Sequence, residues 1–480
     1  MDKQIDFIVN GERLVERQVP RRRIVCRTGA AVELPLLAKH HAEAWRESRT
    51  ADLSSLRLSD IVAFLYNVGQ NWKSREYARR RVYIQDLVAY LGYSQKMAEW
   101  EANWIAMLLS SQAAMYDAVA IELGDRHILD AWIKREESEV RAFPKGQTLH
   151  VCAGNVPMSC VVSIVRALLT KNTCVIKASS DDLFTPYALA GSLMDVDSSS
   201  PLARALTVVH WSRDDDSEEP AKWAAQADVI CAWGADEAMT WAHTHRQGET
   251  DLLAFGPKRS LALICPDVPW DDAAEKLAFS ICAYDQRACF STQQVFVVGD
   301  SEGFIQALGQ ALERLGRFFP KGVHRFDEIA SHAIAQREAV FLGHDMVSSQ
   351  QPAEWTIVRT PAGRVPRHPL GRFIYVHAID RPQDVLPHLN ADVQTLGVHP
   401  WSSALSIRDA AGHAGVSRIV ELGMNNIFRV GGAHDGRYPM QRLVRYVSNE
   451  MPSEVYPKQV AIEINQYRFA EENRFVEFIP

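Results

Sequence analysis

The stretch from Thr148 to Ser179, TLHVCAGNVPMSCVVSIVRALLTKNTCVIKAS, decides the fold class. TLHVCAGN and TCVIKAS are apolar runs that predict buried strands, and VVSIVRALLT between them has the pattern of a helix. A helical crossover between two strands brings the second strand back in the same direction as the first. The stretch therefore predicts an α/β fold with a parallel sheet.

The same alternation continues along the chain. ALTVVHW, EPAKWAAQA and DVICAWG follow as strand, helix and strand, and a second series runs from SLALICP through VFVVG and GFIQALGQALERLG to GRFIYVHAI. Two such series predict two α/β halves that pack together with a cleft between them.

The N-terminal part has a different character. Asn10-Gly11 predicts a turn between two short strands, and residues 35–140 are mainly helical in pattern. Ser59 and Asp60 predict the cap of one helix, and EANWIAMLLSSQAAMYDAVAIELG predicts a long helix that ends at Gly124.

Composition limits the class of protein. The chain has 480 residues, of which 47% are apolar and 23% charged, as in a globular protein of two to three domains. A net charge of −7 argues against a nucleic-acid-binding body. The eight cysteines show no zinc spacing, so we expect no metal site and a reducing cytoplasmic location. Arg166 interrupts the most apolar run, and we expect no membrane span.

Three residues lie where a predicted strand of the first series ends. Asn155 could donate its amide to an oxyanion, or simply shape a strand-to-helix turn. Lys177 could meet a ribose or phosphate, or reach from the core to water. Gly234 would let the backbone approach a ligand, although the full dinucleotide fingerprint is absent. Ligands of open α/β sheets bind at this carboxyl edge.

A fourth residue, Cys289, stands in YDQRACFSTQQ, between a polar turn and the apolar run VFVV. A reactive cysteine needs polar and partly open surroundings, whereas many free cysteines are buried and inert. Both interpretations stay open on this residue alone. The ordered set of amide, lysine, glycine and thiol favours chemistry.

That order resembles the aldehyde dehydrogenase superfamily. A closer resemblance, over nearly the whole chain, is to the LuxC family of acyl-CoA and acyl-protein reductases, through DIVAFLYNVGQNW, ELGDRHILDAW, VRAFPKG, AGNVPMS, YDQRACFS, GVSRIVELGMNNIFRVGGAHDG and QRLVRY. The resemblance implies an aldehyde dehydrogenase-like fold with a Rossmann-type cofactor domain. It divides the chain into a mainly helical region, a nucleotide-binding domain, a catalytic domain and a C-terminal segment that returns to the cofactor and oligomerisation region, over 1–140, 141–254, 255–426 and 427–480.

The resemblance also assigns roles to the candidate residues. Cys289 matches the acylated nucleophile, and Asn155 matches the oxyanion-binding amide. Lys177 and Gly234 match cofactor-binding positions, and Ser180 stands where NAD-preferring relatives carry a glutamate. Because a carboxylate there would repel a 2′-phosphate, the serine favours NADPH.

Two departures from the superfamily bear on the reaction. Ala254 stands where hydrolytic members carry the glutamate that activates water. A reductase must keep water from its thioester, so the loss argues for reduction. His368 replaces another superfamily glutamate, and we assign it no role.

The resemblance implies NADPH-dependent reduction of a long-chain fatty acyl thioester to the aldehyde, as in bacterial bioluminescence. It further implies an acyl-protein synthetase partner and a homotetramer. The alternatives are the same reaction on another acyl thioester in a non-luminescent pathway, an oxidative dehydrogenase, and a scaffold subunit without activity. Chain length and the acyl donor stay open.

Overall fold

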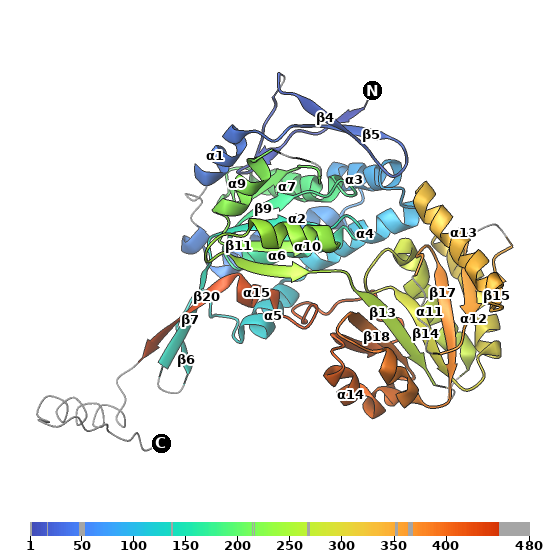
Figure 1. Ribbon diagram of the computed structural model, residues 1–480. Coiled ribbons are helices and arrows are strands. Elements are labelled where there is room, and N and C mark those ends of the chain that lie inside the picture. The colour runs from blue at the N-terminus through green and yellow to red at the C-terminus, as the bar shows by residue number, and fades with distance from the viewer. Residues whose placement is uncertain are drawn as a thin grey trace, which may run out of the picture.

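The protein is described from a computed structural model that covers residues 2–16, 18–47, 53–135, 138–213, 215, 217–265, 269–350, 354–362 and 368–450. Figure 1 shows two α/β lobes side by side, with a small antiparallel sheet projecting from the larger one. Of the C-terminal segment expected over 427–480, residues 451–480 lie outside the described residues.

Seven strands of the described chain form the sheet of the larger lobe, in the order β12-β11-β8-β9-β10-β2-β3. Five consecutive strands are parallel, as predicted: β8 (Gln147–Val151), β9 (Thr173–Lys177), β10 (Leu206–Val209), β11 (Val229–Trp233) and β12 (Asp251–Phe255). Helices α6 (Met158–Leu169), α7 (Phe184–Asp197), α9 (Glu219–Gln226) and α10 (Asp236–His245) connect them. The strand order reverses between β8 and β11, and this is where such sheets bind ligands.

A second sheet builds the smaller lobe, in the order β15-β16-β17-β14-β13-β18-β19 over the described residues. Its parallel strands are β13 (Arg259–Ile264), β14 (Thr292–Val298), β16 (Thr356–Arg359), β17 (Phe373–Ile379), β18 (Val393–His399) and β19 (Arg418–Glu421). β15 (Asp345–Ser348) closes one edge antiparallel, and the longer helices are α11 (Trp270–Cys282), α12 (Glu302–Phe318) and α13 (Phe326–Phe341).

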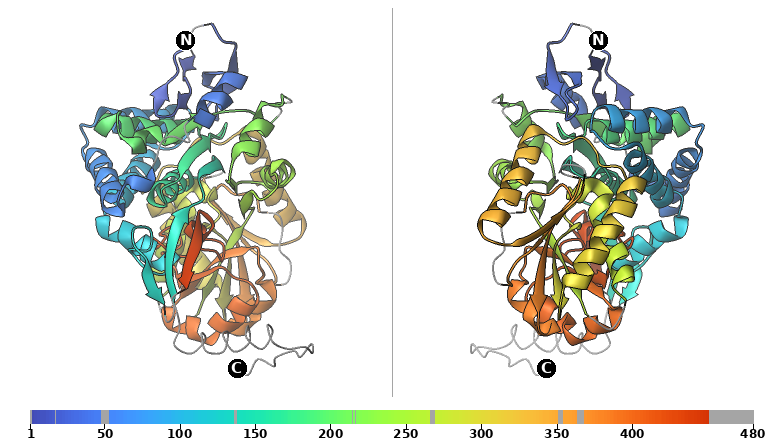
Figure 2. Two further views of the ribbon diagram at one scale, coloured as in Figure 1. Left: turned by 90° about the vertical axis from the view of Figure 1, so that its left-hand side faces the viewer. Right: turned by 90° about the vertical axis from the view of Figure 1, so that its right-hand side faces the viewer.

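The N-terminal region combines strands and helices. β2 (Ile8–Val9) and β3 (Glu12–Arg13), joined by the predicted Asn10-Gly11 turn, extend the first sheet. β1 (Lys3–Gln4), β4 (Arg21–Val25) and β5 (Ala31–Pro35) form a separate sheet. Figure 2 shows these strands at one end of the molecule, with the smaller lobe toward the other.

The N-terminal helices differ from prediction at two points. α2 (Leu58–Lys73) begins one residue before Ser59, so the predicted cap residues Ser59 and Asp60 lie inside its first turn. Asp60 still stabilises the start of the helix, because its side chain accepts the backbone N–H of Arg57 at 3.0 Å. The predicted long helix divides into α4 (Gln95–Leu109) and α5 (Gln112–Leu123), bent by 73°. Ser111 starts the second helix by accepting the N–H of Ala114, a local bond that competes with helix continuation.

Other parts of the helical region agree with the sequence. Gly124 ends α5 in the left-handed conformation, with φ of 86°. No single helix among the described ranges meets the length and hydropathy of a membrane span; the bent pair α4–α5 does so by length and composition alone.

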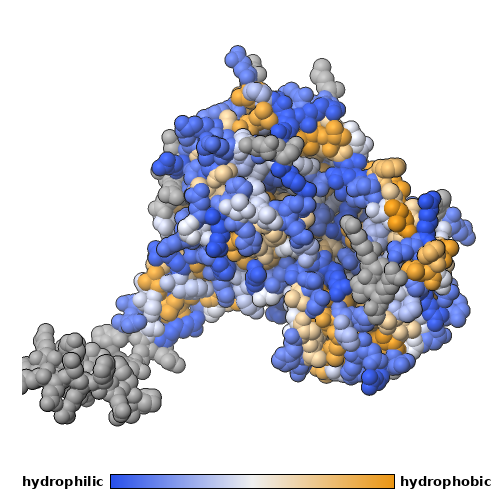
Figure 3. Space-filling view, in the orientation of Figure 1, coloured by the Kyte–Doolittle hydropathy of each residue, from blue (hydrophilic) through white to orange (hydrophobic). Residues whose placement is uncertain are grey.

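The C-terminal part of the described chain returns to the first lobe. β20 (Val444–Glu450) pairs antiparallel with β7 (Ser138–Pro144), which in turn pairs with β6 (Ile133–Arg135). Figure 3 shows a mostly polar surface, with apolar side chains exposed on α13, among them Phe326, Ile334 and Phe341.

Candidate active site

One cavity of about 1520 Å³ lies between the two lobes. The segments that follow β8, β9 and β11 line it from the first lobe, and the segment that precedes β14 lines it from the second. Asn155, Lys177, Gly234 and Cys289 all lie on its wall. The structure therefore brings together four residues that are spread over 135 positions of the sequence. Ser180 is not among the lining residues.

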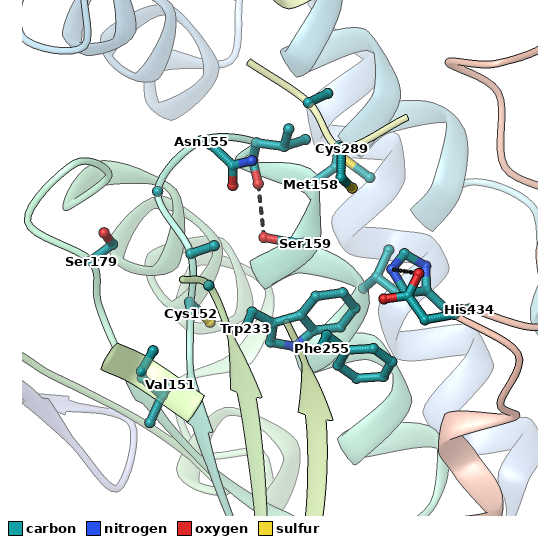
Figure 4. A pocket seen from close by; sticks show the side chains of 18 of the residues that line it. Val151, Cys152, Asn155, Met158, Ser159, Ser179, Trp233, Phe255, Cys289 and His434 are labelled. Atoms are coloured by element: carbon teal, nitrogen blue, oxygen red, sulfur yellow. Dashed lines mark hydrogen bonds and ion pairs between the residues drawn. The ribbon is translucent and has the colours of Figure 1, made fainter. Parts of the chain in front are cut away.

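Cys289 is half-buried, whereas the other seven cysteines are buried. Its side chain lies at the cavity, near Asn155 and Met158 in Figure 4. The hydroxyl of Ser260 donates to its carbonyl oxygen at 2.7 Å and fixes its backbone to β13. Cys289 is therefore not fully buried, and its contact with the cavity favours a reactive role over an inert one.

A left-handed turn immediately precedes the cysteine. Tyr284, Asp285 and Gln286 have φ of 63°, 49° and 59°, a run that costs free energy for non-glycine residues. Asp285 accepts from the buried Arg372 at 2.7 Å, and Gln286 exchanges hydrogen bonds with the backbone of Phe373 at 2.7 and 2.8 Å. Asp285 thus pairs with a distant arginine in the second lobe, and these bonds hold the turn.

The Cys289 thiol is protonated at neutral pH. Burial raises its pKa to about 12, and the negative charge of Asp435 adds to this, while hydrogen bonds from Gln394 and nearby backbone oppose it. The side chain reaches the cavity but is surrounded by protein on its other sides. Attack on a substrate therefore requires loss of the thiol proton, and the thiolate that forms is a strong nucleophile.

Asn155 is exposed to the cavity and connects the two lobes. Its Nδ2 donates to the carbonyl oxygen of Arg287 at 2.9 Å, two residues before the cysteine. An amide has two N–H groups, so the second remains for a developing oxyanion beside Cys289.

Lys177 gives the opposite end of the cavity a positive charge. Burial lowers its pKa to about 8, and the positive charge of Arg213 acts in the same direction, while Cys152 and Asp181 oppose it. Among the described residues no carboxylate lies within ion-pair distance of Lys177. A half-buried lysine that makes no ion pair with the described residues, on a wall that also carries the Ser179 hydroxyl, fits the phosphate and ribose of a dinucleotide.

The neighbouring serines divide between two environments. Ser179 lines the cavity, whereas the Ser180 hydroxyl hydrogen-bonds His210 Nε2 at 3.0 Å. Sequence reasoning selected Ser180 by alignment with a glutamate and missed Ser179. Gly234 follows β11 with φ of 144°, a conformation that favours glycine, and its backbone lies on the cavity wall.

Several residues of the site were not singled out from the sequence. Trp233 and Phe255 stack at 3.9 Å between ring centroids, and His434 contacts Trp233 edge-on at 4.8 Å (Figure 4). Gln394 and Asp435 complete this side of the cavity. His434 and Asp435 belong to GGAHDG, a motif that carried the family resemblance but suggested no role by itself.

An apolar branch of the cavity lies against the N-terminal helices. Its walls come from α4, α5 and α6. The apolar lining includes Trp104, Met107, Leu108, Met115, Val162, Val165 and Leu169. Such a surface suits a hydrocarbon chain.

Two residues from the sequence comparison lie off the cavity wall. Ala254 is in β12, and its carbonyl oxygen accepts from Arg437 at 3.0 Å. His368 uses both ring nitrogens on local backbone, Phe373 O at 2.7 Å and Leu370 N at 3.0 Å.

A group of three possible metal ligands, Glu16, His40 and His41, lies in the N-terminal region. His41 Nδ1 accepts the backbone N–H of Ala38 at 3.0 Å, so its Nε2 carries the proton and donates to Glu16 at 3.0 Å. Without a free nitrogen on His41, the group is a hydrogen-bonded cluster.

Comparisons with known proteins agree with this geometry. The sequence pattern of the family described as acyl-CoA reductase (LuxC) matches residues 53–446. The chain is 44% identical to a long-chain acyl-protein thioester reductase of Photorhabdus laumondii subsp. laumondii and 43% identical to one of Aliivibrio fischeri, each over the full length of both chains.

Solved structures show the fold. A lactaldehyde dehydrogenase superposes with a TM-score of 0.73 at 16% identity, covering 94% of this chain and all of that one. An NADP-dependent glyceraldehyde-3-phosphate dehydrogenase from Bacillus halodurans C-125, complexed with NADP, superposes with a TM-score of 0.72 at 15% identity, covering 94% of this chain and 100% of that one. The aldehyde dehydrogenase-like fold predicted from the sequence is confirmed.

Proposed function

Because the chain belongs to the LuxC acyl-CoA reductase family, we propose that it reduces a long-chain fatty acyl thioester to the fatty aldehyde with NADPH, through an acyl-Cys289 intermediate. The protein is an oxidoreductase that acts on an acyl thioester and uses a nicotinamide cofactor. The aldehyde is the kind that bacterial luciferase consumes.

The half-buried Cys289 on the same cavity as Asn155 is the observation that carries the proposal. After losing its proton, the sulfur forms a bond to the acyl carbon, and the bond to the donor thiol breaks. The donor leaves as a thiolate and takes up the proton. The free N–H of Asn155 stabilises the oxyanion of the tetrahedral intermediate.

The cofactor end of the site uses Lys177, Ser179 and the backbone of Gly234. The bound cofactor supplies the hydride that reduces the acyl group. NADPH is favoured over NADH because Lys177 offers a positive charge and neither Ser179 nor Ser180 adds a carboxylate. Asp181, which also lines the cavity, is paired with Arg325.

Acyl transfer to the chain can be tested without cofactor. Incubation with tetradecanoyl-CoA should add one acyl group to the intact mass, and Cys289→Ser should abolish the adduct. Cys152→Ser is a matched control, since this buried cysteine lines the same cavity. An adduct that survives Cys289→Ser would refute the assignment.

The oxidative alternative is disfavoured by the residue at position 254 of the sequence. Ala254 supplies no base where hydrolytic relatives carry a glutamate, and a base of that kind is what an acid-forming enzyme needs. Long-chain aldehyde and NADP without a thiol acceptor should therefore give no fatty acid. The scaffold alternative would be supported only by an absence of any acyl adduct.

We further propose that the chain assembles as a homotetramer and receives its acyl group from an acyl-protein synthetase. The projecting sheet β6-β7-β20 supports assembly, since it extends beyond the lobe that carries it (Figure 1). Light scattering on the purified protein tests the first point, and transfer from an acylated synthetase to Cys289 tests the second.

A further inference from the structure

We propose that Gln394 and Asp435 decide the fate of acyl-Cys289: the Gln394 amide holds the Asp435 carboxylate and keeps it from activating water, so that the acyl group is reserved for reduction. The inference rests on the proposed function, because it concerns the acyl-Cys289 intermediate. This chain has Ala254 where hydrolytic relatives carry a glutamate base. Asp435 is a carboxylate on the same cavity as Cys289, and Gln394 controls it.

The Gln394 amide lies between the carboxylate and the sulfur. Gln394 is buried in β18 and lines the cavity. Its Nε2 donates to Asp435 Oδ1 at 2.8 Å, and the same side chain hydrogen-bonds the Cys289 thiol. Its Oε1 is buried without another partner in the described part of the chain.

The charge of Asp435 fixes which way the amide faces. A carboxylate only accepts hydrogen bonds, so the NH₂ group of Gln394 faces Asp435, and the hydrogen bond that the same NH₂ group donates to the sulfur opposes the rise of the Cys289 thiol pKa. Near neutral pH an amide neither takes up nor releases a proton. The side chain that joins the Asp435 carboxylate to the Cys289 sulfur is therefore one that cannot act as a general base.

A rigid turn holds Asp435 in place. His434 and Arg437 exchange backbone hydrogen bonds of 2.8 and 3.0 Å, and Asp435 between them has φ of 47°. Arg437 donates to the carbonyl oxygen of Ala254 at 3.0 Å. The turn is thus anchored at the position where hydrolytic relatives carry their base.

His434 does not neutralise the carboxylate. Its Nε2 lies 3.9 Å from Asp435 Oδ1, and burial among Trp233, Phe255 and Phe428 lowers its pKa to about 4. At neutral pH the imidazole is uncharged, and the hydrogen bond from Gln394 is the contact that restrains Asp435.

Hydrolysis of the intermediate would need a free base at this point. The oxygen of water would bond to the acyl carbon while the base takes a water proton, and the bond from carbon to the Cys289 sulfur would break. The products are the fatty acid and the protonated thiol. General-base assistance contributes about 10²–10⁴-fold to such steps, so its suppression strongly favours reduction.

Exchanging the two groups tests the inference. In the double variant Gln394→Glu with Asp435→Asn, the new asparagine donates to the new glutamate, and the carboxylate moves beside the sulfur. The enzyme is acylated with tetradecanoyl-CoA, freed of excess donor, and left without nicotinamide cofactor. Loss of the adduct by intact mass and release of tetradecanoic acid are followed over time.

We expect deacylation at least about 10²-fold faster in the double variant than in the unmodified protein, at the lower end of general-base catalysis. The rate should rise with pH through the pKa of the new glutamate, because only its ionised form accepts a proton. An acyl-enzyme as stable as that of the unmodified protein would overturn the inference.

Asp435→Asn alone is the matched control. It keeps an amide beside the sulfur and adds no base, so its acyl-enzyme should be no less stable than the original. Iodoacetamide should react faster with its Cys289 at neutral pH, because removing the negative charge lowers the thiol pKa. Rapid hydrolysis in this control would also overturn the inference.

The proposed function can fail separately from this inference. If no variant forms an adduct on Cys289, the acyl-enzyme itself is refuted. If adducts form but the double variant does not hydrolyse them, only the role of Gln394 and Asp435 is refuted. A cooperative melting curve of each variant confirms that it is folded.

Discussion

At the residue scale, the thiol of Cys289 is accessible from the cavity but is protonated at neutral pH. Its side chain reaches the cavity, yet burial raises its pKa to about 12. A thiol of this kind reacts through a small thiolate fraction, and that fraction is more nucleophilic than a thiolate of low pKa. The protein therefore has a strong nucleophile that is mostly stored as the thiol.

The first prediction concerns pH. Because Cys289 is protonated below its raised pKa, the thiolate fraction should grow about tenfold for each pH unit between 7 and 10. The rate of iodoacetamide addition to Cys289, followed by peptide mass with Cys289→Ala to identify background, should rise in the same proportion. A plateau below pH 8 would contradict the raised pKa.

The second prediction concerns Asn155. Asn155→Ala removes the oxyanion donor and the bond to Arg287, so acyl transfer to Cys289 should slow by about 10²–10³-fold. Stopped-flow or quenched acylation measures this rate directly. Ser159→Ala is the control, since its hydroxyl lines the cavity but bonds only Val156 O in its own helix turn. Equal rates for the two variants would exclude the assigned role.

At the element scale, the turn before Cys289 depends on contacts with the residues at the start of β17, in the same lobe. Three successive left-handed residues are costly, and the buried pair of Asp285 with Arg372 offsets the cost. The positive charge of Arg372 holds the pKa of Asp285 far below its usual range, against the opposing effect of burial, and the His324 ring 3.6 Å away acts in the same direction as Arg372. The turn is thus stabilised by an interaction that spans 87 positions of the chain.

The third prediction follows from this pair. Arg372→Met leaves the Asp285 carboxylate buried without its partner, and we expect a loss of about 3–5 kcal/mol in the free energy of unfolding. Urea unfolding followed by tryptophan fluorescence measures the change. Arg381→Met, which breaks the exposed pair with Asp384, should cost less than about 1 kcal/mol. Similar losses in both variants would contradict the structural role of the buried pair.

Acidification should weaken the contribution of the Asp285–Arg372 pair to stability. Because the Asp285 pKa is depressed in the folded protein, its contribution to stability is present above the ordinary carboxyl pKa and is lost as pH falls toward the folded value. The difference in the free energy of unfolding between the unmodified protein and Arg372→Met should therefore become smaller below about pH 4.

At the scale of the whole molecule, the site exists only because two lobes meet. The first lobe presents the ends of β8, β9 and β11, and the second presents the segment before β14. Asn155 crosses from one lobe to the other by its bond to Arg287. The C-terminal motif with His434 and Asp435 then closes the cavity from a third direction.

The fourth prediction concerns cofactor binding to this assembly. NADPH at about a hundred times its Kd should stabilise the fold by about 2.7 kcal/mol, seen as a higher melting temperature. Lys177→Gln should greatly reduce the shift, since it removes a cavity cation that makes no ion pair with the described residues. Lys258→Gln is a matched control, because Lys258 also lines the cavity but donates to Ala391 O at 2.6 Å. An unchanged shift in Lys177→Gln would contradict the assigned position.

The sequence by itself determined the parallel α/β architecture, because apolar runs of strand length alternate with helical runs, and each such pattern is local. It also singled out Asn155, Lys177, Gly234 and Cys289, since each stands at the end of a predicted strand or beside a polar turn. The resemblance to LuxC proteins rested on dispersed motifs, and the family is confirmed.

Only the tertiary structure decided which neighbours these residues have. The bend between α4 and α5, the division between Ser179 and Ser180, and the pairing of Asp285 with Arg372 depend on contacts between distant segments. Gln394 and Asp435 are 41 positions apart, and neither carries a local signal of function. Their meeting beside Cys289 is set by the packing of β18 against the C-terminal turn, which no local pattern encodes.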